Sequence, residues 1–519
     1  MLEFRFRLTP GVIPPSLLHK MFFASWGRVP GPADICVAEN ELIVKTDTSN
    51  SGTFHVLRPY QPLGIVLEST DSLISRSEPY LLVRELGRGM LGRILRKLFE
   101  WQMTGFRLSD QLRTELGELS RRFSKAVVAD VHLPETEEEH RRLLDPLADA
   151  AMKLSTEYTS QALSSRISVN DKLPTLFGVG MQTHPAELMY EFGIFAPHLG
   201  DAFHSVLPLP AWNEIEPEPN HYCWEKIEGK IFNPQRFGFQ VVLGPILSFD
   251  PDSMPQWLIP HLSEPGRLEG HVNRLVLNIA ERYGHIAQAI ILANRINSFH
   301  LKDISIERGL SIVCQLAKLL RHKGVSVPLI IGTDRPWGEY LLDHRPDLDL
   351  FQIGEVLIGV PEIDGLLLEL NFGLDKNASL PRDPLSIISV VEQWSALGKK
   401  MFFSLSVPSM LDSQMLDEQK AVNPLNLWSE GLQQRWTEML LDILIGRRST
   451  HGIFWQTLQD VPKIVEESHR QNSPQSPYNG LIDEQNTLKL AFKHFTHFRK
   501  TYLKNEELVT RNRERNGTN

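Results

Sequence analysis

Asn294 and Arg295 stand directly after a short apolar run, at a place where a folded chain can use them for chemistry. The run covers residues 289–293, and two amides and an arginine follow it, Asn294, Arg295 and Asn297. A buried strand that ends in polar residues is how a parallel barrel presents its functional groups. We therefore expect a site at the end of this strand, built from the side chains that follow it and its neighbours.

Seven further apolar runs share this pattern. All eight cover residues 176–181, 203–208, 239–249, 289–293, 329–332, 365–370, 401–405 and 452–455. Helical spacing of apolar residues recurs between them, at 272–283, 306–322, 385–397 and 432–445. This alternation predicts a (β/α)8 TIM barrel in the α/β class. A doubly wound sheet is the alternative, but no GxGxxG turn follows the first run and no GxxxxGK[ST] loop occurs.

The residues that follow these runs are rich in tryptophan, carboxylate and amide. They include Trp212, Asp250, Trp257, Asn294, Arg295, Asp334, Trp337, Glu339, Glu369 and Trp455. Sugar sites use this mixture, since apolar sugar faces stack on aromatic rings and hydroxyls need paired donors and acceptors. The set lacks the His/Asp cluster of a metallohydrolase, so we expect neither a metal nor a cofactor.

Glu369 is the first candidate for acid–base chemistry. It lies among leucines in LLLELNFG near a strand end, where burial raises a carboxyl pKa, as a general acid needs. The alternative is an ion pair with an arginine such as Arg295 or Arg335. Glu339 is the second catalytic candidate, or else an ordinary loop carboxylate, and Asp250 and Asp334 are third choices.

The other strand-end residues are candidates for substrate binding, each with a packing alternative. Arg295 either neutralises Glu369 or binds an anionic group such as a uronate, which suits a planar bidentate donor. Trp257 and Trp455 either stack on a substrate or cap the barrel. Asn294 either binds a sugar hydroxyl or holds a neighbouring loop.

Three further segments surround the predicted barrel. Residues 1–76 alternate apolar and polar positions between Gly, Pro, Asn and Ser residues, which indicates a small sandwich-like β-domain. Residues 77–172 change to helical spacing and form a helical linker or subdomain. The barrel occupies residues 173–505, and residues 506–519 are a charged tail that we expect to be disordered.

Composition limits the partners of the chain. Its 519 residues are 42% hydrophobic and carry a formal net charge of −9, which leaves no basic footprint for nucleic acid. No apolar run approaches the roughly 18 residues that span a membrane.

The start, MLEFRFRLTP, is unlike a signal peptide, so we expect a cytoplasmic location, with unconventional export left open. The three cysteines are far apart and predict free thiols.

Five fragments of the barrel region form an ordered series. They are WNEIEPEPNHYCW (212–224), VLGPILSFDPDSMPQWL (242–258), HVNRLVLNIAERYGHIAQAIILAN (271–294), GVPEIDGLLLEL (359–370) and GIFWQTLQD (452–460). In order and spacing they resemble the barrel of family-10 glycoside hydrolases, the endo-1,4-β-xylanases. The resemblance implies a (β/α)8 barrel with an N-terminal extension, and a β-linked oligo- or polysaccharide as partner.

At both catalytic positions the chain departs from the family pattern. Family members use two glutamates in a retaining geometry. Asn294 matches the Asn before the acid/base glutamate, but Arg295 replaces that glutamate, and Ser404 or a neighbour replaces the nucleophile. An arginine keeps its proton at neutral pH, and a serine without a base is a poor nucleophile. Trp257 and Trp455 match the family's LPxWL tryptophan and its substrate-stacking indole.

Two functions are consistent with this pattern. The first is hydrolysis of O-glycosyl bonds in a β-linked polysaccharide or oligosaccharide, with Glu369 and Glu339 as substitute carboxylates. The alternative is a catalytically degenerate carbohydrate-binding or scaffold protein, because both family glutamates are missing. A transferase or lyase on the same barrel also stays open, since a fold does not determine a reaction class.

Overall fold

A computed structural model shows how these segments fold. It describes residues 2–25, 30–31, 33–38, 41–46, 51–130, 132–169, 172–181, 198–250, 253–264, 266–298, 304–342, 348–374, 377–410, 428–460 and 478–503. The tail at 506–519 that we expect to be disordered lies outside these residues. Within the described part of the chain, no helix has the length and apolar character needed to cross a membrane.

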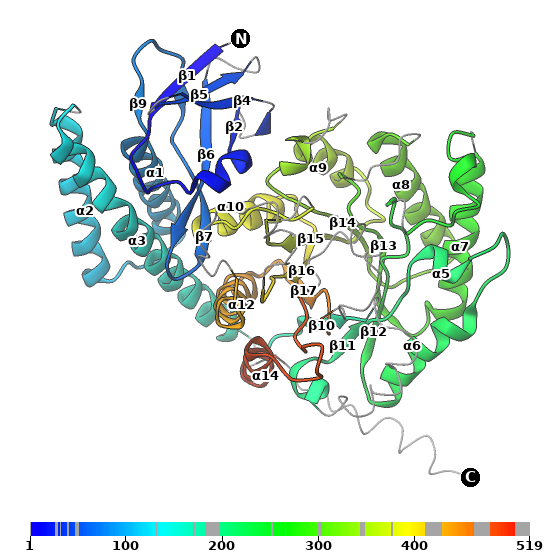
Figure 1. Cartoon of the computed structure of the whole chain (residues 1–519). Helices are drawn as coiled ribbons and strands as arrows, with labels where there is room; N and C mark the ends of the chain where they lie inside the picture. The colour runs from blue at the N-terminus through cyan, green and yellow to red at the C-terminus, as the bar shows by residue number, and fades with distance from the viewer. Residues whose placement is uncertain are drawn as a thin grey trace.

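The chain begins with a β-domain of two sheets (Figure 1, blue). One sheet has the order β4 (Asp34–Ala38), β5 (Glu41–Thr46), β1 (Leu2–Arg7), β9 (Tyr80–Leu81). The other has the order β3 (Pro30–Gly31), β2 (Phe22–Ala24), β6 (Ser51–Tyr60), β7 (Gly64–Ser69), with β8 (Leu73–Ile74) paired to β6. Apolar positions at a period of two bring Phe4 against Phe23 and Phe6 against Phe54, with ring centroids 4.6 and 4.8 Å apart. The expected β-domain is therefore present ahead of the barrel.

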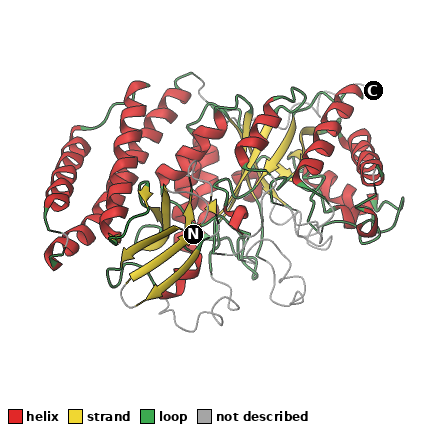
Figure 2. Ribbon diagram, turned by 90° about the horizontal axis from the view of Figure 1, so that it is seen from above, coloured by secondary structure: helices red, strands yellow, loops and turns green. Residues whose placement is uncertain are grey.

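Three helices connect this domain to the barrel. They are α1 (Leu82–Met103), α2 (Asp110–Val128) and α3 (Pro134–Ile167). Helix α3 starts with Pro134 and has Glu135 and Glu137 in its first turn, where a proline and acidic side chains are favourable. The acidic run at 135–139 thus lies in the first turns of a helix. Figure 2 shows these helices alongside the β-sheets of the N-terminal domain.

Glu392 of α10 (Pro384–Ser395) holds the helical segment against the barrel. Its carboxylate accepts hydrogen bonds from Lys97 at 2.8 Å, Trp101 at 3.1 Å and Arg447 at 2.9 Å. Burial raises the pKa of Glu392, but Arg447 and Lys97 outweigh this and lower it overall. One carboxylate therefore joins α1 to the outer helices of the barrel.

Eight parallel strands form a closed barrel, which confirms the predicted (β/α)8 architecture. In order they are β10 (Leu176–Gly180), β11 (Ser205–Leu207), β12 (Gln240–Leu243), β13 (Ala287–Ala293), β14 (Leu329–Thr333), β15 (Gly365–Asn371), β16 (Lys400–Ser406) and β17 (Thr450–Trp455). Each of the eight apolar runs in the sequence overlaps one of these strands. Strand β17 pairs with β10, which closes the ring.

Helices surround this ring (Figure 1). They are α5 (Trp212–Ile215), α6 (Trp224–Arg236), α7 (Arg267–Tyr283), α8 (Ile306–His322), α9 (Leu350–Ile358), α10, α12 (Glu430–Ile445) and α14 (Leu490–Tyr502). The described residues also include the 3-10 helices η1 (Pro15–Lys20), η3 (Ile259–His261) and η4 (Glu339–Leu342). The four helices that the sequence analysis places between strands correspond to α7, α8, α10 and α12.

A dry apolar layer fills the barrel interior. It contains Leu207, Val242, Ala289, Ile291, Ile330, Leu367, Phe402 and Phe454, one or two side chains from each of seven strands. Phe402 is 2% exposed, and a Cβ added at Gly365 or Gly452 would lie 2.6 or 2.5 Å from its ring. Glycine at these two positions therefore makes room for Phe402. Because the interior is filled, functional groups are confined to the strand ends.

His204 provides a test of how the barrel responds to acid. Its Nε2 accepts a hydrogen bond from the Phe177 amide, and burial lowers its pKa to about 4. The unfolded chain binds a proton at this histidine below about pH 6.5, whereas the folded chain does so only near pH 4. We expect acidification from pH 7 to pH 4 to destabilise the protein through this group by about 3 kcal/mol. His204→Gln keeps an acceptor but does not titrate.

Urea unfolding of the parent and His204→Gln at pH 7 and pH 4 checks this expectation. The parent should lose more free energy of unfolding than the variant. Asp442 and Asp460 have pKa values raised to about 6 by burial and titrate in the opposite sense, but they do so in both proteins and cancel in the comparison. Equal losses in the two proteins would contradict the assignment.

Candidate functional site at the carboxyl end of the barrel

Glu369 lies on the inner face of β15, near its carboxyl end. Leu367, two residues earlier, belongs to the apolar layer, so the period of a strand brings Glu369 to the same face. Its Cα is in register with that of Ser404 on β16. The Glu369 carboxylate therefore lies on the strand next to Ser404. In the sequence comparison with family-10 glycoside hydrolases, Ser404 or a neighbour stands at the position of the nucleophile. The residue is only 4% exposed.

Three side chains from neighbouring strand ends hold this carboxylate. Asn294 donates from Nδ2 to Glu369 Oε1 at 3.0 Å, and Arg295 donates from Nε to Oε2 at 2.9 Å. Gln456, after β17, donates to Oε2 at 3.5 Å. Of the two sequence interpretations of Glu369, the ion pair with Arg295 is what the structure shows. The expected convergence of the strand ends is therefore observed for Asn294, Arg295 and Glu369.

Arg295 adopts a left-handed backbone conformation, with a φ of 51°. This conformation costs a non-glycine residue about 1–2 kcal/mol, and such residues cluster at functional sites. Arg335, the residue after Asp334 at the end of β14, also has a positive φ, of 42°. The Nη1 of Arg295 lies 3.9 Å from Oδ2 of Asp250, so the guanidinium stands between two carboxylates.

Burial and charge act in opposite directions on this pair. Burial raises the pKa of Glu369, while Arg295 and the hydrogen bond from Asn294 oppose the rise. Burial also lowers the pKa of Arg295, but the carboxylates of Glu369, Asp250 and Asp334 more than offset it and raise the pKa overall. Because the guanidinium keeps its proton at neutral pH, it favours an ionised Glu369 beside it.

Asp334 is fixed next to this network by the loop after β13. Asn297 donates from Nδ2 to the Asp334 carbonyl at 2.8 Å and accepts from the Asp334 amide at 3.0 Å. Ser298 donates to the Asp334 carboxylate, and Arg335 donates to it at 3.2 Å. Asp334 therefore contributes negative charge to the site, while its own hydrogen bonds join the loops that follow β13 and β14.

Several buried polar atoms at the strand ends have no hydrogen-bond partner among the residues that the structure describes. They are Asn294 Oδ1, Thr333 Oγ1, Asn371 Nδ2, Ser406 Oγ and Gln456 Oε1, from the ends of five adjacent strands. An unsatisfied buried polar atom costs about 1–3 kcal/mol. A native site accepts this penalty when a ligand supplies the missing partners. The set contains both donors and acceptors, which is what sugar hydroxyls need.

Glu339 and Trp337 belong to a different network. Glu339 lies in η4, is 6% exposed and forms an ion pair with Arg382. The Arg382 guanidinium lies 4.6 Å over the Trp337 ring. Glu339 and Glu369, the two glutamates that the sequence analysis pairs, share no hydrogen-bond partner, and each is held by an arginine of its own.

The three remaining tryptophans are engaged with the protein. Trp455 is 0% exposed, donates to the Asn479 carbonyl at 2.9 Å and packs edge-on against Phe495 of α14. Trp212 and Trp257 both donate to Glu216, to its carboxylate at 2.9 Å and its carbonyl at 3.0 Å. Trp257 is partly exposed, whereas Trp212 is buried. This packing favours structural roles for Trp212 and Trp455, and stacking on a substrate stays a prediction for Trp257.

Sequence reasoning missed Arg382 as a partner of Glu339 and Trp337. It stands in SLPRDPLS, between prolines and without periodic neighbours, so no local pattern singles it out. Among the described residues, no group of three His, Cys, Asp or Glu side chains could hold a metal ion.

Comparison with known proteins adds likeness of fold only. No protein-family model matches the chain, and no curated protein matches it. One similar solved structure is a glycosylated endo-β-1,4-xylanase of glycoside hydrolase family 10 from Gloeophyllum trabeum. Its sequence is 12% identical, and the TM-score is 0.46. The match covers 63% of this chain and 96% of the xylanase chain. The exo-β-1,4-mannosidase Op5Man5 from Opitutaceae bacterium strain TAV5 matches with 14% identity and a TM-score of 0.44, over 63% and 59%. At this identity neither activity nor substrate follows from the likeness.

The buried ion pair predicts strong coupling between its two members. Glu369→Gln leaves Arg295 without its nearest counter-charge, and Arg295→Met leaves Glu369 charged and buried. We expect each variant to lose about 3 kcal/mol or more of unfolding free energy. The double variant should lose less than the sum, with a coupling of about 1–3 kcal/mol. Urea unfolding of all four proteins measures this, and losses that simply add would contradict the pairing.

Proposed function

We propose that this chain is a glycoside hydrolase-like protein that binds a β-linked oligo- or polysaccharide at the carboxyl end of its barrel and hydrolyses an O-glycosyl bond there. The observation that carries the proposal is Glu369, a buried carboxylate on the inner face of the barrel, surrounded by unpartnered donors and acceptors. Active sites of (β/α)8 barrels lie at this end. The resemblance of the sequence to family-10 glycoside hydrolases supports the same reaction class.

Glu369 is the carboxylate that faces the anomeric carbon in this proposal. Burial raises its pKa overall, but Arg295 opposes the rise and Asn294 orients Oε1, so we assign it the role of nucleophile in place of the general acid expected from its apolar sequence context. Asp250 is the second carboxylate. It contacts the other side of the same guanidinium, and its side chain is 29% exposed, which leaves it accessible to a glycosidic oxygen. Glycosidases use such a pair of carboxylates.

A specific observation favours a second function, carbohydrate binding without hydrolysis. Both oxygens of Glu369 already accept hydrogen bonds, from Asn294 and Arg295. A carboxylate that is fully engaged by the protein holds the site in shape without reacting. The unpartnered atoms of Asn371 and Gln456 would then bind sugar hydroxyls, and the bound sugar would not be hydrolysed.

Reducing-sugar release from xylans, glucans and uronate-containing oligosaccharides distinguishes the two functions. The parent should release sugar, and Glu369→Gln should be slower by about 10³-fold or more, as expected for the loss of a catalytic group. Glu85→Gln is the matched control, because Glu85 is also buried and paired with an arginine, Arg88, but lies in α1. It should retain the parent rate per folded molecule.

Each other outcome has a definite meaning. Release by the parent and by Glu369→Gln alike would remove Glu369 from the mechanism. Saturable quenching of tryptophan fluorescence by an oligosaccharide, without release from any substrate, would establish the binding function in place of hydrolysis. Neither release nor binding across the panel would overturn both.

A further inference from the structure

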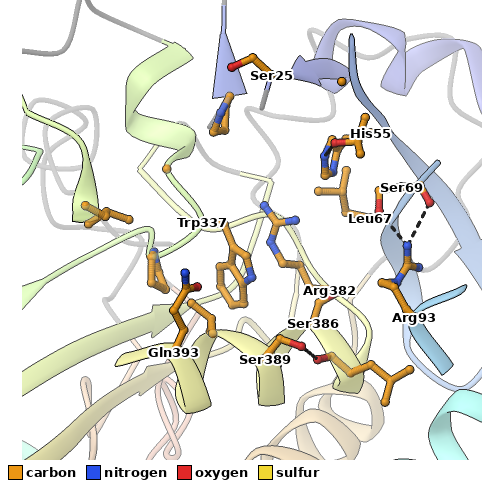
Figure 3. A pocket seen from close by; sticks show the side chains of 18 of the residues that line it. Ser25, His55, Leu67, Ser69, Arg93, Trp337, Arg382, Ser386, Ser389 and Gln393 are labelled. Atoms are coloured by element: carbon orange, nitrogen blue, oxygen red, sulfur yellow. Dashed lines mark hydrogen bonds between the residues drawn. The ribbon is translucent and has the colours of Figure 1, made fainter. Parts of the chain in front are cut away.

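A cavity of about 850 Å³ lies between the β-domain, α1 and the barrel, away from the carboxylate site. Figure 3 shows Ser25, His55 and Arg93 on one side of it and Trp337, Arg382 and Gln393 on the other. Neither Glu369 nor Arg295 is among the residues that line it. Small-molecule sites have about this volume and occur preferentially where domains meet.

Arg382 is the charged group at the centre of this cavity (Figure 3). The residue is 4% exposed, and its Nη2 is paired with Glu339. Its Nε has no partner, and its Nη1 makes no hydrogen bond within the described part of the chain. A buried guanidinium with unused donors is suited to a carboxylate or a phosphate, which accept from two nitrogens at once.

Three other charged lining residues are engaged by the protein, whereas Arg96 and Glu355 line the cavity from exposed positions. Arg93 donates from Nη1 to the Ser69 carbonyl at 3.0 Å and to its hydroxyl at 2.8 Å. Glu100 accepts from Lys97, and Asp349 caps the first turn of α9. Arg93, Glu100 and Asp349 therefore each have a partner within the protein, whereas the buried Arg382 guanidinium has donors left for an anion.

The surface of α10 adds groups that recognise hydroxyls. Gln393 is exposed, and its side chain makes no hydrogen bond among the described residues. The hydroxyls of Ser386 and Ser389 donate to Asp383 and to the Leu385 carbonyl, so their oxygens still accept. The partly exposed Trp337 indole provides an apolar wall beside Arg382.

We propose that this cavity binds a hydroxyl-bearing organic anion, a sugar phosphate or a sugar acid, with the anionic group on Arg382 and the hydroxyls on Gln393 and the serines of α10. Since both the β-domain and the barrel line the cavity, a bound ligand contacts both. Occupancy therefore stabilises the docked arrangement of the two domains. Binding at this cavity requires no catalytic activity of the barrel. The binding proposal can therefore be tested independently of the proposed hydrolysis.

Calorimetric titration of the full chain with glucose 6-phosphate, glucuronate, inorganic phosphate and neutral glucose tests the proposal. We expect saturable binding of glucose 6-phosphate or glucuronate, and which of the two binds more tightly identifies the anionic group. Glucose lacks the anionic group, and inorganic phosphate lacks the sugar hydroxyls. Each should bind at least about tenfold more weakly, because each good polar contact contributes roughly a factor of ten in affinity.

Two variants locate the binding. Gln393→Glu places a negative charge at the cavity without touching a buried contact, and should weaken anion binding at least about tenfold through like-charge repulsion. Gln111→Glu, on the exposed face of α2, adds the same charge elsewhere and should leave the affinity unchanged. No saturable anion binding, equal binding of glucose, or unchanged affinity in Gln393→Glu would each overturn the proposal.

Discussion

The ion pair between Glu369 and Arg295 determines how the carboxyl end of the barrel is arranged. A carboxylate as buried as Glu369 needs a counter-charge, because an isolated charge in a low-dielectric interior costs several kcal/mol. Arg295 supplies it from the next strand but one, in a left-handed backbone conformation. Its guanidinium also approaches Asp250, and Asn294 fixes the second oxygen of Glu369. Any chemistry at this site must therefore involve a carboxylate whose pKa burial raises and Arg295 lowers.

The barrel was predictable from the sequence because its signal is local and repeated. Each buried parallel strand appears as an apolar run, and strand ends converge whatever loops join them. The same argument placed Asn294, Arg295 and Glu369 together, since each follows or ends a strand. It did not predict the contacts that Glu339 and Trp337, further along the loop after β14, make with Arg382. It also could not separate inward from outward indoles, and Trp455 packs on α14.

The N-terminal domain was predictable as strands and helices, but its docking on the barrel was not. Docking depends on single long-range contacts such as Glu392 with Lys97 and Trp101, and the Trp436 indole with the Leu63 carbonyl at 3.1 Å. None of these has a sequence pattern. The cavity around Arg382 arises from this docking, so it becomes visible only in three dimensions. The loop after β14 runs between both sites, with Asp334 at one end and Glu339 at the other.

A crystal structure of the full chain with a bound β-1,4-linked oligosaccharide tests the central claim most directly. The account predicts sugar density at the carboxyl end of the barrel, with hydroxyls hydrogen-bonded to the free atoms of Asn294, Asn371 or Gln456 and a ring beside Glu369. Density for the sugar only elsewhere on the molecule, with the Glu369–Arg295 pair covered by protein, would contradict it.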